Sequence, residues 1–133
     1  MTRGRRVVLE SIESATEPLS ASGVFATIGG ACDQATVYRA LDYLEETGRA
    51  ESFVLRCSEH GTERYFVSTG LPHRHWFHCE ACHRFIDLGA CRLGSLSAEL
   101  ERELGVRVIR HTLYFSGLCA ECGKRGHGEA GAI

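Results

Sequence analysis

Residues 33–48 read DQATVYRALDYLEETG, and this stretch predicts the helix that decides the fold of the N-terminal half. Asp33 is a favoured N-cap residue, and Gly48 stands where a capping glycine ends a helix. An apolar stripe at i, i+4 and i+7 is formed by Val37, Leu41 and Leu44. The side chains that face away from this stripe or lie on its flanks include Thr36, Tyr38 and Arg39. The segment therefore predicts an amphipathic helix with polar groups exposed along its N-terminal half.

The flanking sequence extends this helix into a winged helix-turn-helix unit. Two helices are expected before residues 33–48. Thr2 can cap the first, and the second, which is shorter, starts at Ser20. The apolar stripe of the first helix is Val8, Ile12 and Ala15. Residues 51–55 and 64–67 follow as two extended segments, which predict a hairpin. Three helices and a hairpin form the winged-helix arrangement, whose third helix enters the DNA major groove.

The second half of the chain predicts a smaller α/β unit of the order β–β–α–β. Strands are expected at residues 75–79, 85–88 and 106–115. A helix with a leucine stripe lies between the last two strands, and its stripe is Leu93, Leu96, Leu100 and Leu104. The fold class is therefore α+β. The domains are a winged helix-turn-helix domain at residues 1–70, an α/β dimerisation and metal-binding domain at 71–123, and a glycine-rich flexible tail at 124–133.

The seven cysteines contain two Cys-x-x-Cys pairs, Cys79 with Cys82 and Cys119 with Cys122. Two such pairs supply four thiolates, which complete a closed tetrahedral zinc site with no position for a substrate. The pattern predicts one structural zinc ion. The alternatives are a thioredoxin-like thiol redox protein and a zinc module that only mediates protein contacts.

Five of the seven histidines lie within residues 71–123, and three of them predict another metal site. His73 and His75 project to the same face of an extended strand, and His111 lies before the second cysteine pair. Asp87 and Cys91 are further candidate ligands. This set predicts a regulatory site for a second divalent metal, with zinc favoured over iron or manganese. An alternative sensor would join Cys57 and His60 to His73 or His75, and no role is predicted for Cys32.

The composition of the chain limits which classes of protein it can belong to. The 133 residues are 44% hydrophobic and carry a net charge of −2, as in an ordinary globular protein. We expect no membrane span and no secretory signal, hence a cytoplasmic protein. No nucleophile, base and orienting group form a catalytic set, so an enzyme is not expected. Because the chain is not basic overall, DNA binding would rest on a local cluster that includes Arg3, Arg5, Arg6 and Arg39.

The chain resembles the ferric uptake regulator (Fur) superfamily over about residues 2–123. The resemblance rests on residues 35–41, on both cysteine pairs, and on His73, His75 and His111 with their spacing to those pairs. It implies a metal-responsive repressor of the zinc uptake regulator type that binds inverted-repeat double-stranded DNA as a homodimer. It further implies that Tyr38 contacts bases, while Arg39 and an N-terminal arginine (Arg3 or Arg5) contact phosphates.

The resemblance breaks down at the hinge metal sensor of the superfamily. Ligand positions of that sensor hold Pro18, Ser68, Arg74 and Trp76 here, and only Asp87 matches. At the second superfamily site the three histidines are retained, but Gly94 replaces the glutamate, for which Cys91 or a neighbouring acid could substitute. The alternative within the superfamily is an iron-, manganese- or peroxide-responsive regulator.

Overall fold

The computed structural model describes residues 1–125, which divide into two compact units. Unit 1 is Met1–Pro72 and unit 2 is His73–Ile133, so the division falls two residues beyond the expected boundary at residue 70. Of the expected tail at 124–133, Lys124 ends the last helix, Arg125 caps it, and residues 126–133 lie outside the described residues. Each unit is described by itself.

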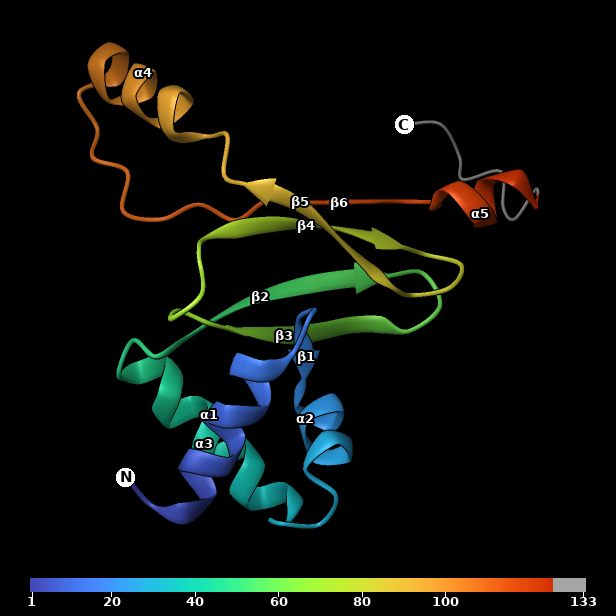
Figure 1. Ribbon diagram of the computed structural model, residues 1–133. Coiled ribbons are helices and arrows are strands. Elements are labelled where there is room, and N and C mark those ends of the chain that lie inside the picture. The colour runs from blue at the N-terminus through green and yellow to red at the C-terminus, as the bar shows by residue number, and fades with distance from the viewer. Residues whose placement is uncertain (126–133) are drawn as a thin grey trace. The chain divides into compact units, whose positions relative to one another are not determined.

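Unit 1 starts with three helices, α1 (Arg3–Ser14), α2 (Ala21–Ile28) and α3 (Gln34–Glu46) (Figure 1). The expected caps are present: Thr2, Ser20 and Asp33 each accept a backbone N–H three residues ahead through a side-chain oxygen. The first helix ends at Ser14, so the prediction that Ala15 continues it is wrong, because Ala15 adopts an extended backbone as its C-cap. No helix within residues 1–125 combines the length and apolar character needed to cross a membrane.

A three-stranded antiparallel sheet completes unit 1. Its strands are β1 (Leu19–Ser20), β2 (Ala50–Cys57) and β3 (Gly61–Ser68), in the order β1-β3-β2. The hairpin of β2 and β3 pairs Ala50 with Ser68 and Cys57 with Gly61, so both strands are longer than the sequence predicts. Gly61 closes the turn with φ at +74°, a conformation that side chains disfavour. Three helices and this hairpin confirm the winged helix-turn-helix.

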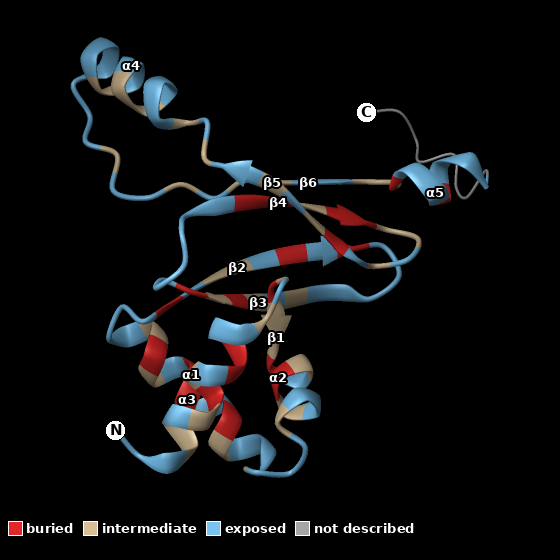
Figure 2. Ribbon diagram, in the orientation of Figure 1, coloured by how far each residue is buried: buried red, intermediate tan, exposed pale blue. Residues whose placement is uncertain are grey.

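The core of unit 1 lies where the three helices meet the sheet (Figure 2). The predicted stripe of α3 forms its centre, since Val37, Leu41 and Leu44 are at most 1% exposed. The other buried members are Val8, Ile12, Ala21, Val24, Ala40, Ala50 and Phe66. One face of α3 is thereby held against the unit, which leaves the opposite face exposed.

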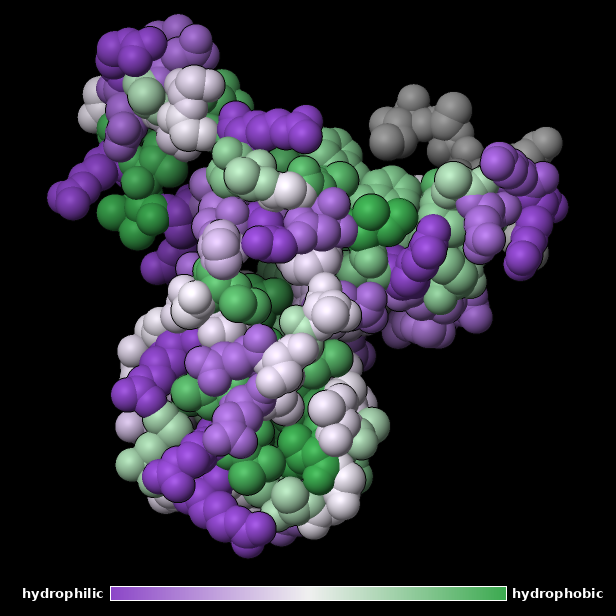
Figure 3. Space-filling model, in the orientation of Figure 1, coloured by the Kyte–Doolittle hydropathy of each residue, from purple (hydrophilic) through white to green (hydrophobic). Residues whose placement is uncertain are grey.

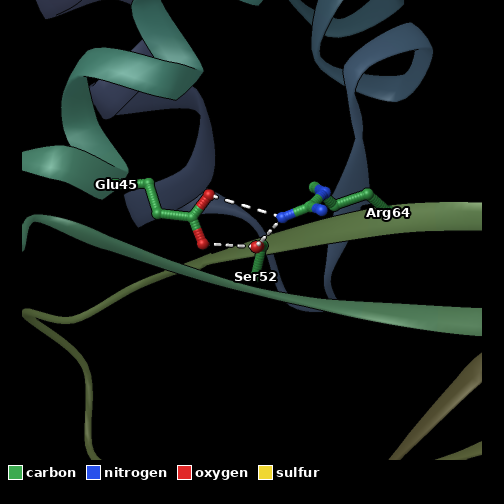
Figure 4. A network of polar contacts seen from close by, with 3 residues as sticks. All are labelled: Glu45, Ser52 and Arg64. Atoms are coloured by element: carbon green, nitrogen blue, oxygen red, sulfur yellow. Dashed lines mark hydrogen bonds and ion pairs between the residues drawn. The ribbon is translucent and has the colours of Figure 1, made fainter.

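A polar network joins the C-terminal end of α3 to the wing (Figure 4). Ser52 on β2 donates its hydroxyl proton to Glu45 of α3. Arg64 on β3 donates to the Ser52 hydroxyl at 3.0 Å, and its guanidinium lies 3.7 Å from the Glu45 carboxylate. The network fixes the helix relative to the hairpin, although an ion pair this exposed adds little stability by itself.

Unit 2 is built on a mixed three-stranded sheet. Its elements are β4 (Arg74–Cys79), β5 (Phe85–Ala90), α4 (Gly94–Leu104), β6 (Tyr114–Gly117) and α5 (Ala120–Lys124). The strand order is β5-β4-β6, with β5 antiparallel and β6 parallel to the central β4. The predicted β–β–α–β order is confirmed, and α4 lies in the crossover that a parallel pair requires.

The prediction of a strand over residues 106–115 is wrong. Only Tyr114–Gly117 forms a strand, and residues 105–113 have no regular secondary structure. The alternating, β-branched pattern of this segment suits a half-buried strand, but apolar side chains along it are exposed: Val106 is 49% and Ile109 is 72% exposed. A pattern specifies a strand only where a neighbouring backbone can pair with it.

Helix α4 contributes nothing to the buried core within the chain (Figure 2). Its predicted stripe is accessible instead, with Leu96 48%, Leu100 37% and Leu104 65% exposed. Hydrophobic side chains gather beside α4 and over the segment that follows it (Figure 3). A leucine face of this kind on a small unit indicates a surface that another chain covers.

Candidate functional site

The two predicted cysteine pairs converge in unit 2. Cys79 ends β4, and Cys82 lies in the turn before β5. Cys119 caps α5, and Cys122 lies within it. The parallel pairing of β4 with β6, which sets Cys79 opposite Gly117, brings the pairs together across the 36 residues that separate them. The short helix α5 was not predicted, but its Cys-x-x-Cys spacing is that of a helical turn.

The four thiol groups form a metal-sized cluster. All four Sγ atoms lie within 4.8 Å of one another, and those of Cys82 and Cys119 are 3.9 Å apart. Tetrahedral zinc with Zn–S bonds of about 2.3 Å sets adjacent sulfurs roughly 3.8 Å apart. Three of the four residues are buried, and none of the seven cysteines forms a disulfide. The cluster therefore fits a closed zinc site.

Backbone N–H groups aim at the sulfur atoms, as thiolate ligands require. The amides of Cys82 and Cys119 donate to the Cys79 sulfur at 3.5 and 3.4 Å. Burial raises the pKa of the Cys79 thiol, but these backbone donors outweigh it and lower that pKa to about 6. The hydrogen bond with Cys119, together with burial, raises the pKa of Cys122 to about 12. Four crowded thiols thus share their protons unequally, and a bound cation would favour the deprotonated form of all four.

A second cluster unites His73, His75, Cys91 and His111, whose ligand atoms also lie within 4.8 Å of one another. The Nε2 atom of His111 is 3.0 Å from that of His73 and 3.0 Å from that of His75. The Cys91 sulfur is 3.3 Å from His75 Nε2 and 3.4 Å from His111 Nε2. Around a tetrahedral zinc these separations would be roughly 3.3 Å between nitrogens and 3.6 Å between nitrogen and sulfur.

Hydrogen bonds alone do not account for the second cluster. His75 Nδ1 donates to the Leu113 carbonyl at 3.1 Å, so Nε2 of the neutral ring carries a lone pair. Burial, together with the neighbouring His73 and His111, lowers the pKa of His75 and thereby favours this neutral form. His111 Nε2 carries at most one proton, yet it faces two imidazole nitrogens and a thiol. Several lone pairs of nitrogen and sulfur therefore point at one another, an arrangement that a bound cation would stabilise.

The structure brings four of the five proposed regulatory ligands together, and Asp87 is not one of them. The Asp87 carboxylate pairs with Arg74 and also accepts the Gly89 amide at 2.7 Å. Cys91 takes part instead because it directly follows β5, whose pairing with β4 sets it beside His75. The backbone partners were not foreseen: the Leu113 carbonyl at His75 and the Leu93 amide at Cys91 carry no signal in the sequence.

The remaining sulfur and imidazole candidates lie in unit 1. Cys57 ends β2, and His60 lies in the turn of the β2–β3 hairpin, whereas His73 and His75 belong to unit 2. Cys32 is half-buried between α2 and α3 and packs against the core of unit 1.

The predicted contact residues of α3 are on its accessible side. Tyr38 is 58% exposed, and Arg39 is exposed while donating to the Thr36 hydroxyl at 3.3 Å. Asp33 accepts the Thr36 amide at 2.8 Å, and hydrogen bonds from Thr36 lower its pKa. The first turns of α3 thus hold an aromatic ring and a guanidinium in a capped, regular helix, which suits insertion into a groove.

The predicted arginines of the N-terminus lie on α1. Arg3 is exposed in the first turn. The Arg5 guanidinium stacks on the Tyr43 ring of α3, 3.7 Å from the ring centroid, a contact not predicted from the sequence. Because stacking leaves guanidinium edges available, Arg5 is held close to α3 and can still donate to an anion.

Comparison with known proteins agrees with this architecture. The family model described as "Ferric uptake regulator family" matches residues 1–116. The "Ferric uptake regulation protein" of Neisseria meningitidis is 28% identical over 130 residues, which cover 95% of this chain and 88% of that protein.

Solved structures show the same fold. The ferric uptake regulator of Helicobacter pylori, described as having three functional metal-binding sites, superposes with a TM-score of 0.72 at 21% identity, covering 92% of this chain and 81% of that one. A zinc uptake regulator complexed with zinc and DNA gives a TM-score of 0.60 at 24% identity, covering 94% and 84%. The chain therefore belongs to the ferric uptake regulator family of metal-responsive transcription regulators.

Proposed function

We propose that this chain is a cytoplasmic, metal-dependent repressor that binds inverted-repeat DNA as a homodimer and controls zinc homeostasis. The observation that carries the proposal is the cluster of His73, His75, Cys91 and His111 in a chain that also exposes Tyr38 and Arg39 on a winged helix. Unit 2 would sense the metal and unit 1 would bind the DNA. The reducing cytoplasm would keep the seven thiols free for metal binding.

Helix α3 would read the DNA through its N-terminal half. Tyr38 would contact base edges in the major groove, with Thr36 beside it. Arg39, Arg3 and Arg5 would bind phosphates, since the net charge of −2 leaves attraction to DNA to local groups. The polar network of Glu45, Ser52 and Arg64 would keep the wing in register with the helix.

The homodimer is supported by what unit 2 leaves exposed. Leu96, Leu100 and Leu104 form an apolar face on α4, and residues 106–113 have the pattern of a strand without its pairing. A second copy would supply both a cover for the leucines and a strand partner. A two-fold dimer would present two α3 helices to two half-sites, which requires an inverted repeat.

The metals would have separate roles in this scheme. Zinc held by Cys79, Cys82, Cys119 and Cys122 would stabilise unit 2, whose described core contains three of these cysteines. The second metal would join His73, the first residue of unit 2, to ligands at Cys91 and His111. This metal would order the chain directly after Pro72. It would favour the DNA-binding arrangement because it would bind that arrangement more tightly than the others.

The test compares DNA binding by two variants. His75→Ala should abolish the increase in operator affinity that zinc causes, because His75 Nε2 faces both Cys91 and His111 in the second cluster. Arg39→Ala should weaken binding but leave the zinc response in place. Fluorescence anisotropy with an inverted-repeat duplex, at fixed salt and with the four-cysteine zinc retained, measures both. A zinc response that survives in His75→Ala would refute the assignment of the sensor.

A further inference from the structure

We propose that Cys91 is the fourth ligand of a closed three-histidine, one-cysteine site, and that its thiolate makes the site selective for Zn²⁺ over Mn²⁺ and Fe²⁺. The inference rests on the proposed function, in which this cluster holds the regulatory metal. It adds that one donor of the cluster, the Cys91 thiolate, decides which metal is sensed.

The position of Cys91 is set by the sheet and by the backbone that follows it. Residue 91 comes directly after β5, and its sulfur faces His75 Nε2 at 3.3 Å and His111 Nε2 at 3.4 Å. The Leu93 amide donates to the same sulfur at 3.4 Å. This amide and the two imidazoles fix the position of the Cys91 sulfur within the cluster.

Neither of the other two positions considered for the fourth ligand, Asp87 and Gly94, supplies a donor to the cluster. The Asp87 carboxylate is held by Arg74 and by the Gly89 amide. Gly94, which the resemblance aligns with a glutamate ligand, has no side chain, and a Cβ added there would meet no atom within 4 Å. Within the described residues, the group that converges on the three imidazoles is therefore the thiol of Cys91.

The chemistry of this donor set determines the metal. Three imidazoles and one thiolate fill a four-coordinate shell, and the measured nitrogen and sulfur separations approach those of a zinc tetrahedron. Mn²⁺ binds most effectively to oxygen donors in an octahedral shell, and non-haem Fe²⁺ sites typically include a carboxylate. A soft thiolate in place of a carboxylate moves the preference toward zinc.

Cobalt(II) serves as the probe, because a thiolate bound to Co²⁺ produces a sulfur-to-metal charge-transfer absorption band. The full-length protein keeps zinc in the four-cysteine site, verified by mass spectrometry, and is depleted of weakly held metal before titration. We expect one equivalent of Co²⁺ to give this band. Cys91→Ser should remove the band, and Cys32→Ser, which alters a half-buried cysteine in unit 1, should retain it.

Selectivity is measured by competition between metals for the same site. Cys91→Asp should lower the ratio of Zn²⁺ to Mn²⁺ affinity at least roughly tenfold, since even changes next to a metal ligand alter affinity by 10–100-fold. The Cys32→Ser variant should keep the ratio of the unmodified protein. The result does not depend on DNA binding.

The outcomes separate the inference from the function on which it rests. A charge-transfer band that persists in Cys91→Ser, or an unchanged metal ratio in Cys91→Asp, overturns the role of Cys91 but leaves the sensor assignment standing. Failure of the unmodified protein to bind a further equivalent of Co²⁺ overturns both. Loss of the band together with the lowered ratio supports the inference.

Discussion

Tyr38 and Arg39 are neighbours on α3, but different contacts hold their side chains. Tyr38 is 58% exposed, whereas Arg39 donates a hydrogen bond to the Thr36 hydroxyl at 3.3 Å. A projecting ring can follow the floor of a groove, while a guanidinium held along the helix is better placed for the phosphates at its edge. Substitutions at the two positions should therefore have different signatures.

Tyr38→Ala should weaken binding to the operator by about 1–3 kcal/mol, the usual value of a base contact. Non-specific DNA should bind nearly as before, because phosphate contacts remain. Anisotropy titrations with operator and with scrambled duplex of the same length measure the two affinities. Equal losses on both duplexes would remove Tyr38 from base recognition.

Arg39→Ala should weaken binding to operator and scrambled duplex alike. Removal of one phosphate contact should also reduce the slope of log K against log salt concentration by about 1. Titrations at four or more salt concentrations determine that slope. The assignment of Arg39 to a phosphate would be wrong if the slope stayed that of the unmodified protein.

At the scale of elements, α3 and α4 have similar apolar stripes but opposite environments. Leu41 of α3 is 1% exposed within unit 1, whereas Leu100 of α4 is 37% exposed. Leu41→Ala should lower the free energy of unfolding by about 2–5 kcal/mol, as in other packed cores. Denaturant unfolding followed by circular dichroism measures this loss, and a change below about 1 kcal/mol would contradict the packing of α3.

Leu100→Asp should instead shift the protein from dimer to monomer, because a carboxylate on the apolar face of α4 cannot be buried against a second copy without cost. Ser95→Asp, on the opposite side of the same helix, is the matched control and should remain dimeric. Light scattering coupled to size-exclusion chromatography gives the mass of each variant. An intact Leu100→Asp dimer would place the interface elsewhere.

The elements that the sequence predicts well are those whose signals are local. The caps Thr2, Ser20 and Asp33 and the stripe of α3 depend on neighbouring residues, and the structure has them. Pairing partners are non-local. The pattern of residues 106–115 predicts a strand, but of these residues only Tyr114 and Phe115 belong to one, and nothing local in the sequence predicts the two-residue β1.

The second cluster shows the same limit at a candidate site. The His73 and His75 spacing follows from strand geometry, but the choice between Asp87 and Cys91 depends on where β5 ends and on what Arg74 contacts. Both carry plausible ligand atoms in the sequence. Only the fold separates them.

At the scale of the whole molecule, the buried apolar side chains described in unit 2 are few: Trp76, Phe85 and three cysteines. Its cysteine-rich core contains Cys79, Cys119 and Cys122, and α4 buries nothing within the chain. Small units of this kind depend on metal or on association for stability. Zinc binding and folding of unit 2 should therefore be inseparable.

Cys79→Ser should lose zinc and the dimer together, since Cys79 is fully buried and its sulfur accepts two backbone amides. Structural zinc sites in small peptides contribute about 10–16 kcal/mol, more than a unit of this size could replace. Zinc content by mass spectrometry and molecular mass by light scattering report the two losses. A zinc-free variant that remained dimeric would show that the four cysteines do not support the fold.

In the proposed scheme two metals act on one chain, one for structure and one for control. The most direct measurement is the metal content per protomer of anaerobically purified protein before and after mild chelation, with the affinity for an inverted-repeat duplex measured on the same samples. We expect one zinc that survives chelation and a second, removable metal whose loss abolishes tight DNA binding and whose return restores it. A single zinc per protomer, with a DNA affinity that chelation does not change, would rule out a regulatory metal.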